Sequence, residues 1–208
     1  MSARVAIVDY GVGNLHSAQK AFEHLGCEAV VTSDAATIES APGVVLPGQG
    51  AFGTCMANLA QAGLIEPVRR AARSGRPFLG ICVGMQLLFE ESEESPGVPG
   101  LGIFEGRVVR FPRDRELKVP HMGWNQLRIR RPVPALAQVS DGDYVYFVHS
   151  YHPLPRDPSI VATTTEYGVE FVSSVARDNV YAGVFHPEKS QRVGLKLLAG
   201  FTAMLDAA

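Results

Sequence analysis

The stretch Pro77 to Glu90, PFLGICVGMQLLFE, joins an apolar run to a helix-like segment through a glycine-flanked cysteine in this 208-residue chain. Its first part, Phe78-Leu79-Gly80-Ile81, is a short apolar run that predicts a buried strand, and Met85 to Phe89 predicts the start of a helix. The G-x-C-x-G motif between them is the thiol counterpart of a strand-to-helix elbow, a turn so sharp that its central residue is strained. A Cβ at Gly80 or Gly84 would crowd such a turn. We therefore expect Cys82 at a helix N-terminus, where the helix dipole favours a nucleophilic thiolate.

A buried cysteine beside a glycine-rich turn can also be inert, so a nucleophile needs a partner base. His186 ends an expected strand and is followed by Pro187 and Glu188. In extended chain, residues i and i+2 point the same way, so the carboxylate can reach the imidazole, and proline limits the freedom of the pair. A carboxylate on one ring nitrogen leaves the other free to take a thiol proton. We therefore predict that Cys82, His186 and Glu188 act together.

The remaining histidines are weaker candidates. We expect His16 and His24, on the first helix, to face solvent. His149 and His152 lie three residues apart on an expected strand, so their side chains would point to opposite faces and would not share a metal ion. His121 is expected in a loop before a strand.

Strands and helices alternate in the first half of the chain, which predicts a parallel sheet covered by helices. The expected strands are Arg4 to Val8, Glu28 to Thr32 and Val44 to Leu46. One expected helix follows Asn14 as its N-cap, and another runs from Thr54 to Arg73 with interruptions near Gly63 and Pro67.

The segment Glu90 to Gly100 is acidic and rich in Pro and Gly, which predicts a solvated surface loop. The chain beyond it is mostly β. The expected elements are strands at Gly106 to Phe111, Trp124 to Ile129, Tyr144 to Tyr151 and Ile160 to Thr165, a hairpin of Glu170 to Ala176 with Val180 to Phe185, and a helix from Ser190 to Leu205. Because there is no repeat and no long linker, we expect one domain over residues 1–208.

Two glycine-rich loops follow strands. The first, Gly11-x-Gly13 with Asp34 further on, has part of a dinucleotide-binding pattern, but Asp9 would repel a pyrophosphate and His16 occupies the third glycine position. We favour a tight turn there. In the second loop, LPGQGAFG at residues 46–53, backbone N–H groups can point at a ligand. The alternative is an ordinary flexible turn.

Composition excludes several classes of function. A net charge of −2 gives no electrostatic reason to bind nucleic acid or an anionic membrane. No segment approaches the ~20 apolar residues of a membrane span, and the N-terminus lacks the features of a signal peptide. Three widely spaced cysteines, Cys27, Cys55 and Cys82, argue against a disulfide framework and a thiolate zinc site. These features predict a cytoplasmic protein.

Considered together, GICVGMQ at residues 80–86 and FHPEKS at 185–190 resemble the class I, or triad, glutamine amidotransferases. The stretches DYGVGN at 9–14, PHMGWN at 120–125 and YFVHSYH at 146–152 are similar to the glutaminase subunits of imidazole glycerol phosphate synthases. The second glycine-rich loop matches them too, so the resemblance covers the whole chain.

The resemblance implies a flavodoxin-like, mostly parallel sheet flanked by helices, with an antiparallel β region in the C-terminal half. It implies that Cys82 is the nucleophile, His186 the base and Glu188 the orienting acid. The further residues that it implies are Gly50 and Val83 at the oxyanion hole, Gln86, Ser150 and Tyr151 for the amino-acid end of glutamine, and Trp124, Asn125 and Lys189 at a partner interface. It implies no metal and no organic cofactor.

The function implied by the resemblance is hydrolysis of glutamine to glutamate and ammonia. The family passes the ammonia to a (β/α)8-barrel cyclase, its partner in a heterodimer, which makes imidazole glycerol phosphate and AICAR in histidine biosynthesis. One alternative is the glutaminase subunit of pyridoxal phosphate synthase, which lacks a PHMGWN stretch. Another is a non-enzymatic regulatory module on the same fold, against which the presence of Cys82, His186 and Glu188 argues.

Overall fold

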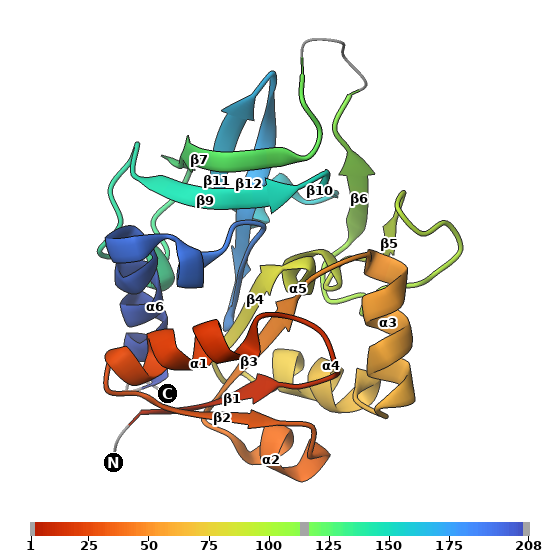
Figure 1. The fold of residues 1–208 in the computed structure, drawn as a ribbon, viewed down its shortest axis with the longest axis vertical. Coiled ribbons are helices and arrows are strands. Elements are labelled where there is room, and N and C mark those ends of the chain that lie inside the picture. The colour runs from red at the N-terminus through yellow and green to blue at the C-terminus, as the bar shows by residue number, and fades with distance from the viewer. Residues whose placement is uncertain (1–2, 113–116, 206–208) are drawn as a thin grey trace.

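A computed structural model describes residues 3–112 and 117–205 as a mixed α/β structure (Figure 1). Its main sheet has eight strands in the order β2-β1-β3-β4-β13-β12-β11-β8. These strands are β1 (Arg4–Val8), β2 (Glu28–Thr32), β3 (Gly43–Gly48), β4 (Phe78–Cys82), β8 (Arg128–Ile129), β11 (Val161–Tyr167), β12 (Val169–Arg177) and β13 (Val180–Gly183). The pairings from β2 to β13 are parallel and the others antiparallel. The expected fold class is confirmed. The single domain stays a prediction whose ends, residues 1–2 and 206–208, lie outside the described residues.

Helices cover both faces of the parallel part of the sheet (Figure 1). They are α1 (Leu15–His24), α2 (Ala35–Ser40), α3 (Phe52–Gln61), α4 (Ile65–Arg73) and α6 (Gln191–Leu205). In the order β2-β1-β3-β4, strands β2 and β3 lie on opposite sides of β1. Because crossovers between parallel strands are right-handed, α1 lies on one face of the sheet and α2, α3 and α4 lie on the other. On the first face the rings of Phe22 and Phe201, whose centroids are 6.1 Å apart, join α1 to α6.

Two expectations about this half need correction. The helix α2 was not expected; Asp34 begins it by accepting a hydrogen bond from the Thr37 amide at 2.7 Å. The expected interruption at Pro67 is wrong, because Pro67 lies in the first turn of α4, where a missing N–H costs nothing. Asp34 is therefore a helix cap, and Asp9 closes its own turn by accepting from the Gly11 amide at 3.0 Å. Both contacts fit the tight-turn interpretation of this region.

The second half adds two small sheets, of order β10-β6-β5 and β7-β9. Their strands are β5 (Glu91–Ser92), β6 (Gly106–Arg110), β7 (His121–Gln126), β9 (Tyr144–His149) and β10 (Tyr151–Pro155), and short 3-10 helices lie at η1 (Pro134–Leu136) and η2 (Pro158–Ile160). Three expectations were wrong here. The strand expected over Trp124 to Ile129 is two strands in different sheets, β7, which begins at His121, and β8. The strand expected over Tyr144 to Tyr151 breaks at Ser150, and the acidic segment pairs through β5 with β6.

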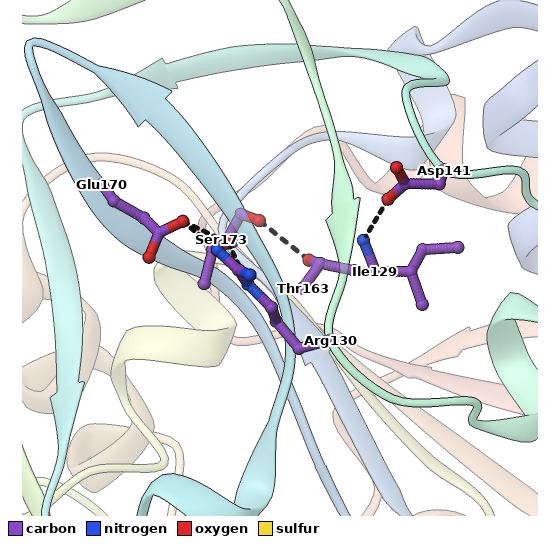
Figure 2. Close-up of polar contacts among 7 residues, drawn as sticks. Ile129, Arg130, Asp141, Thr163, Glu170 and Ser173 are labelled. Carbon is purple, nitrogen blue, oxygen red and sulfur yellow. Dashed lines mark hydrogen bonds and ion pairs between the residues drawn. The ribbon is translucent and has the colours of Figure 1, made fainter.

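Side chains fasten the short edge strand β8 to the main sheet, as Figure 2 shows. The Arg130 guanidinium donates to Thr164 Oγ1 at 2.8 Å and forms an ion pair with Glu170 on β12. The Ile129 amide donates to Asp141 Oδ1 at 2.7 Å. Arg130 thus links the end of β8 to β11 and β12, and Asp141 links β8 to the segment before β9. Within the part of the chain described, every helix is too short or too polar to cross a membrane.

Candidate active site

The expected elbow is present between β4 and the helix α5 (Val83–Gln86). Cys82 has φ 55° and ψ −115°, a strained conformation for a residue with a side chain. A Cβ on Gly84 would lie 2.0 Å from the Leu46 carbonyl oxygen, and one on Gly80 would lie 3.0 Å from Ala182 Cβ. Only glycine lets the neighbouring strands approach the turn this closely, as the motif predicts.

The helix after the elbow is shorter than expected: α5 is a single turn that ends at Gln86. Leu87, Leu88 and Phe89 are fully buried, and their carbonyls serve another segment. The Leu88 carbonyl accepts from the amides of Ile103 and Phe104 at 2.8 and 3.0 Å. Beyond Gln86 the turn tightens to i→i−3 bonds, from the Leu88 amide to the Met85 carbonyl and from the Phe89 amide to the Gln86 carbonyl, both at 3.1 Å. The dipole at Cys82 is therefore that of one turn only.

Parallel pairing brings the catalytic candidates to one edge of the sheet. Strand β4 lies between β3 and β13, with Gly48 paired to Cys82 and Gly183 paired to Ile81. The carboxyl ends of all three strands therefore meet, as do the loops that follow them. His186 lies in the loop after β13, where its amide donates to the Tyr146 carbonyl at 3.0 Å.

His186 and Glu188 form a buried pair, with Nδ1 of the imidazole 2.7 Å from Oε1 of the carboxylate. The chain between them is not extended as expected but forms the 3-10 turn η3 (Pro187–Lys189), which still aims the carboxylate at the ring. Burial lowers the pKa of His186, but interactions with Cys82 and Glu188 outweigh it and raise that pKa to about 10. His186 is thus charged at neutral pH, with its second ring nitrogen available to the sulfur.

A cavity of about 220 Å³ lies over the elbow. Most of the predicted catalytic and substrate-binding residues line this cavity: Cys82, His186, Gly50, Val83, Gln86, Ser150 and Tyr151. Lys189, which was predicted at the partner interface, also lines it. Glu188 lies behind His186 and does not line it. The volume is below that of pockets for drug-sized ligands, about 300–1,000 Å³, so the cavity suits a small metabolite.

Glu94 lines the same cavity, although sequence reasoning assigned its segment to a solvated loop. Its Oε2 accepts from the Phe52 amide at 2.7 Å, at the start of α3. The adjacent Ser95 Oγ accepts from the Gly53 amide at 3.0 Å. An acidic residue at a helix N-terminus is electrostatically favoured there. The pattern of charges in the segment was visible in the sequence, but its docking onto α3 was not.

Two further residues, not predicted from the sequence, donate hydrogen bonds to carbonyls of the second glycine-rich loop. The Tyr10 hydroxyl donates to the Pro47 carbonyl at 2.6 Å, and the Cys55 thiol donates to the Gln49 carbonyl at 3.4 Å. Burial raises the pKa of both the Tyr10 hydroxyl and the Cys55 thiol, so both stay protonated donors at neutral pH. The loop is therefore fixed by buried donors and is not an ordinary flexible turn.

The predicted interface residues of β7 lie outside the cavity. Trp124 is 46% exposed and Met122 63% exposed, and both project from the outer face of the β7-β9 ribbon. The Asn125 side chain turns to the inner face, where its Nδ2 lies 3.3 Å from His121 Nε2. Adjacent residues of one strand point to opposite faces, which separates Asn125 from Trp124.

His149 and His152 do not point apart, contrary to expectation. They lie on separate strands on either side of Ser150, and both rings contact Phe111, with centroid distances of 5.1 and 4.8 Å. Nevertheless, across residues 3–112 and 117–205 no group of three or more His, Cys, Asp or Glu side chains is arranged to hold a metal ion. His16 and His24 are exposed, as expected.

The strained cysteine, the histidine–carboxylate pair and the parallel-sheet edge define a class of protein, and comparison with known families agrees. The family model for class-I glutamine amidotransferases matches residues 6–203, and the chain belongs to that family. Among curated proteins, it is 55% identical over 206 residues to the imidazole glycerol phosphate synthase subunit HisH of Geobacter sulfurreducens, covering 97% of this chain and 99% of that one. It is 50% identical to the HisH subunit of Aquifex aeolicus, covering 95% of each chain.

Solved structures agree on the fold. PurLQS from Thermotoga maritima superimposes with a TM-score of 0.75 at 20% identity, covering 97% of this chain and 98% of that one. A crystal structure of a glutamine amidotransferase matches with a TM-score of 0.73 at 21% identity and the same coverage, 97% and 98%. At this identity the likeness concerns the fold alone.

Proposed function

We propose that this chain is the glutaminase subunit of an imidazole glycerol phosphate synthase. It hydrolyses glutamine to glutamate and ammonia, and a cyclase subunit uses the ammonia in histidine biosynthesis. The observation that carries the proposal is the cavity in which Cys82 and His186 meet, with Glu188 bonded to the far side of the imidazole. The HisH names of the relatives support the choice of synthase, and the odd number of well-separated cysteines supports a cytoplasmic location.

In the first half of the reaction, the Cys82 thiolate attacks the side-chain amide carbon of glutamine. The negative charge moves to the amide oxygen, where backbone N–H groups of Val83 and Gly50 are our candidate donors; in comparable sites one such donor contributes about 3–4 kcal/mol. When the intermediate collapses, the C–N bond breaks and the His186 imidazolium gives its proton to the departing nitrogen. Ammonia leaves, and a thioester joins Cys82 to the glutamyl group.

In the second half, His186 is neutral and takes a proton from water as the water attacks the thioester. The C–S bond breaks, glutamate leaves, and the thiolate–imidazolium pair is restored. Glu188 stabilises the imidazolium and keeps Nδ1 occupied, so that Nε2 faces the reacting atoms. The cycle balances as glutamine plus water giving glutamate plus ammonia.

The polar groups around the cavity suit the amino-acid end of glutamine. The Glu94 carboxylate lines the wall and carries the charge opposite to that of an α-ammonium group. Gln86 also lines the wall, and its amide donates to the Tyr151 carbonyl at 3.4 Å. We assign these groups and the Ser150-Tyr151 backbone to recognition of the α-amino and α-carboxylate groups.

We assign the partner surface to the outer face of the β7-β9 ribbon. Met122, Trp124 and Tyr144 are large apolar side chains exposed there, and Tyr144 is 52% exposed. Aromatic residues and methionine are enriched at protein interfaces. The partner we propose is a (β/α)8-barrel cyclase, and Lys189, at the rim of the cavity, would contribute a charged contact close to where ammonia leaves.

A coupled assay tests the proposal. The chain is purified together with its cognate cyclase, and synthesis of imidazole glycerol phosphate is measured with glutamine or with an ammonium salt as the nitrogen source. Cys82→Ala should abolish glutamine-dependent synthesis and leave ammonia-dependent synthesis unchanged, because the thiolate acts only on glutamine.

The matched control is Cys27→Ala, which removes a buried thiol far from the cavity and should preserve both activities. If Cys82→Ala supports normal glutamine-dependent synthesis, Cys82 is not the nucleophile. If the wild-type pair makes no product from glutamine, the assignment of the chain to this synthase is wrong.

A further inference from the structure

We infer that His149 and His121 are positioning residues of the substrate cavity, linked with Asn125 in a directed chain of hydrogen bonds that ends on the Tyr151 carbonyl. The inference rests on the proposed function for its kinetic consequence, but its structural content stands on its own. None of these contacts takes part in the chemistry described above.

The direction of this chain of hydrogen bonds follows from its end at the Tyr151 carbonyl. His149 Nδ1 lies 2.9 Å from the Tyr151 carbonyl oxygen, which can only accept, so Nδ1 must carry the proton. His121 Nδ1 lies 3.0 Å from His149 Nε2, and Asn125 Nδ2 lies 3.3 Å from His121 Nε2. The second Asn125 amide proton goes to the Glu166 carbonyl at 2.8 Å, which fixes the orientation of the amide.

Only one assignment of protons satisfies all these contacts with neutral rings. His149 and His121 must each be protonated on Nδ1, and each must accept on Nε2. The minor tautomer of free histidine is the Nδ1–H form, so the protein must impose it on both rings. Burial lowers the pKa of His149 to about 3 and that of His121 to about 4, which agrees with neutral rings.

Packing holds the rings in place. His121 is stacked between Phe147 and Tyr167, with centroid distances of 4.7 and 3.9 Å. His149 lies against Phe111 and Phe171 at 5.1 and 5.2 Å. Both histidines are buried, and the bond between them is shielded from water, whereas Asn125 at the outer end is partly buried.

The end of the hydrogen-bond chain at Tyr151 lies in the wall of the substrate cavity. The Tyr151 carbonyl accepts from His149 and also from the Gln86 side chain at 3.4 Å. His149, Gln86 and Tyr151 all line the cavity. Loss of the His149 bond would free the turn at Ser150, where β9 gives way to β10, and with it the groups that we assign to the amino-acid end of glutamine.

The first test determines the tautomers of the two histidine rings by NMR and requires no measurement of enzymatic activity. The full chain is labelled with 15N at histidine, and the ring nitrogens of His121 and His149 are assigned by two-bond 1H–15N correlation spectra from pH 5.5 to 8. We expect both rings to be Nδ1–H tautomers that do not titrate. An Nε2–H tautomer or a titration midpoint within this range for either ring would overturn the inference.

The second test separates positioning from folding by glutamine kinetics in the complex with the cyclase. His149→Phe keeps an aromatic ring but loses both bonds, so KM for glutamine should rise about three- to tenfold, the equivalent of one neutral hydrogen bond, with a smaller change in kcat. His149→Asn keeps a donor near the position of Nδ1 and should recover part of this loss.

The matched control is His152→Phe. His152 lies in the same aromatic cluster, but its Nδ1 faces the Pro153 carbonyl at 3.3 Å, and its ring is not a partner in the hydrogen bonds that link Asn125, His121, His149 and the Tyr151 carbonyl. Its KM should stay at the wild-type value. An unchanged KM in His149→Phe, or an equal rise in His152→Phe, would overturn the inference. Absence of any glutamine turnover by the wild-type complex would instead contradict the proposed function, and the tautomers would still decide the inference.

Discussion

At the scale of single residues, the site depends on two unfavourable features that the fold compensates. Cys82 is held at a positive φ, and His186 and Glu188 are a charged pair removed from water. A buried charge is tolerated when a partner of opposite charge is bonded to it. The pair is therefore expected to control both the ionisation of the site and its pH dependence.

Glu188→Gln should lower kcat for glutamine hydrolysis by about 10²- to 10⁴-fold, because an amide does not stabilise imidazolium as a carboxylate does. Glu188 is one of the groups that raise the pKa of His186 to about 10, so its removal lowers that pKa. The basic limb of the profile of kcat/KM against pH should therefore move to lower pH. The measurement is this profile for the complex of wild type or variant with the cyclase.

The control for this prediction is Glu66→Gln, an exposed carboxylate paired with Arg69 on α4, which should change neither kcat nor the profile. A basic limb that stays in place in Glu188→Gln would show that Glu188 is a bystander.

The ionisation of His186 also makes the free energy of unfolding depend on pH. The native state raises the pKa of His186 from 6.5 to about 10, so the stabilisation is complete below pH 6.5 and is lost as the pH rises through about 10.

At the scale of elements, the carboxyl ends of β3, β4 and β13 are brought into contact by glycines. Gly48 and Gly84 pack the second glycine-rich loop against the elbow, where a Cβ on Gly48 would lie 2.4 Å from the Gly84 nitrogen. The distance between the loop and the thiol is thus set by backbone contact, with no adjustable side chain between them. A small change in packing here should affect stability and catalysis together.

Gly84→Ala should destabilise the fold by about 3 kcal/mol, because its Cβ would lie 2.0 Å from the Leu46 carbonyl oxygen, part of a backbone that cannot move away. The matched control is Gly53→Ala, whose Cβ would meet the Ser95 hydroxyl at 2.7 Å; that side chain can rotate away at the cost of the hydrogen bond it accepts from the Gly53 amide, so we expect a loss of only about 1 kcal/mol. Urea unfolding of both variants provides the comparison. Equal midpoints would contradict this account of the elbow.

At the scale of the whole molecule, two surfaces are built from the same ribbon. The inner face of β7-β9 supplies His121 and His149 to the aromatic cluster, and the outer face exposes Trp124 and Met122. The alternation of a strand thus gives one segment a buried role and an exposed one. A partner bound to the outer face would lie one strand thickness from the residues that support the cavity.

Trp124→Ala should weaken binding of the cyclase by at least about 2 kcal/mol, roughly 30-fold in Kd, because a half-exposed tryptophan in a proposed interface fits the pattern of a binding hot spot. Leu154→Ala is the control: Leu154 is 49% exposed on β10, away from the ribbon, and its loss should leave Kd unchanged. Calorimetric titration with the cyclase measures both. Wild-type affinity in Trp124→Ala would place the interface elsewhere.

Features that depend on neighbours along the chain could be predicted from the sequence. Apolar runs and capping residues located most of the strands and helices, and the G-x-C-x-G motif located the strained turn, because turn geometry depends on which residues lack a Cβ. The spacing of His186 and Glu188 also predicted their contact, since two residues so close in sequence cannot be far apart.

Features that depend on contacts between segments distant in sequence became visible only in the folded structure. The helix α5 ends at Gln86, and the carbonyls of Leu87, Leu88 and Phe89 accept from residues 101–104 instead of from a further helical turn. Glu94 reaches the cavity because its segment docks on α3, and His121 joins His149 because β7 pairs with β9. Sequence periodicity reports which face of an element is apolar, but it does not report which other element covers that face. Hydrogen bonds and packing across the fold decide that.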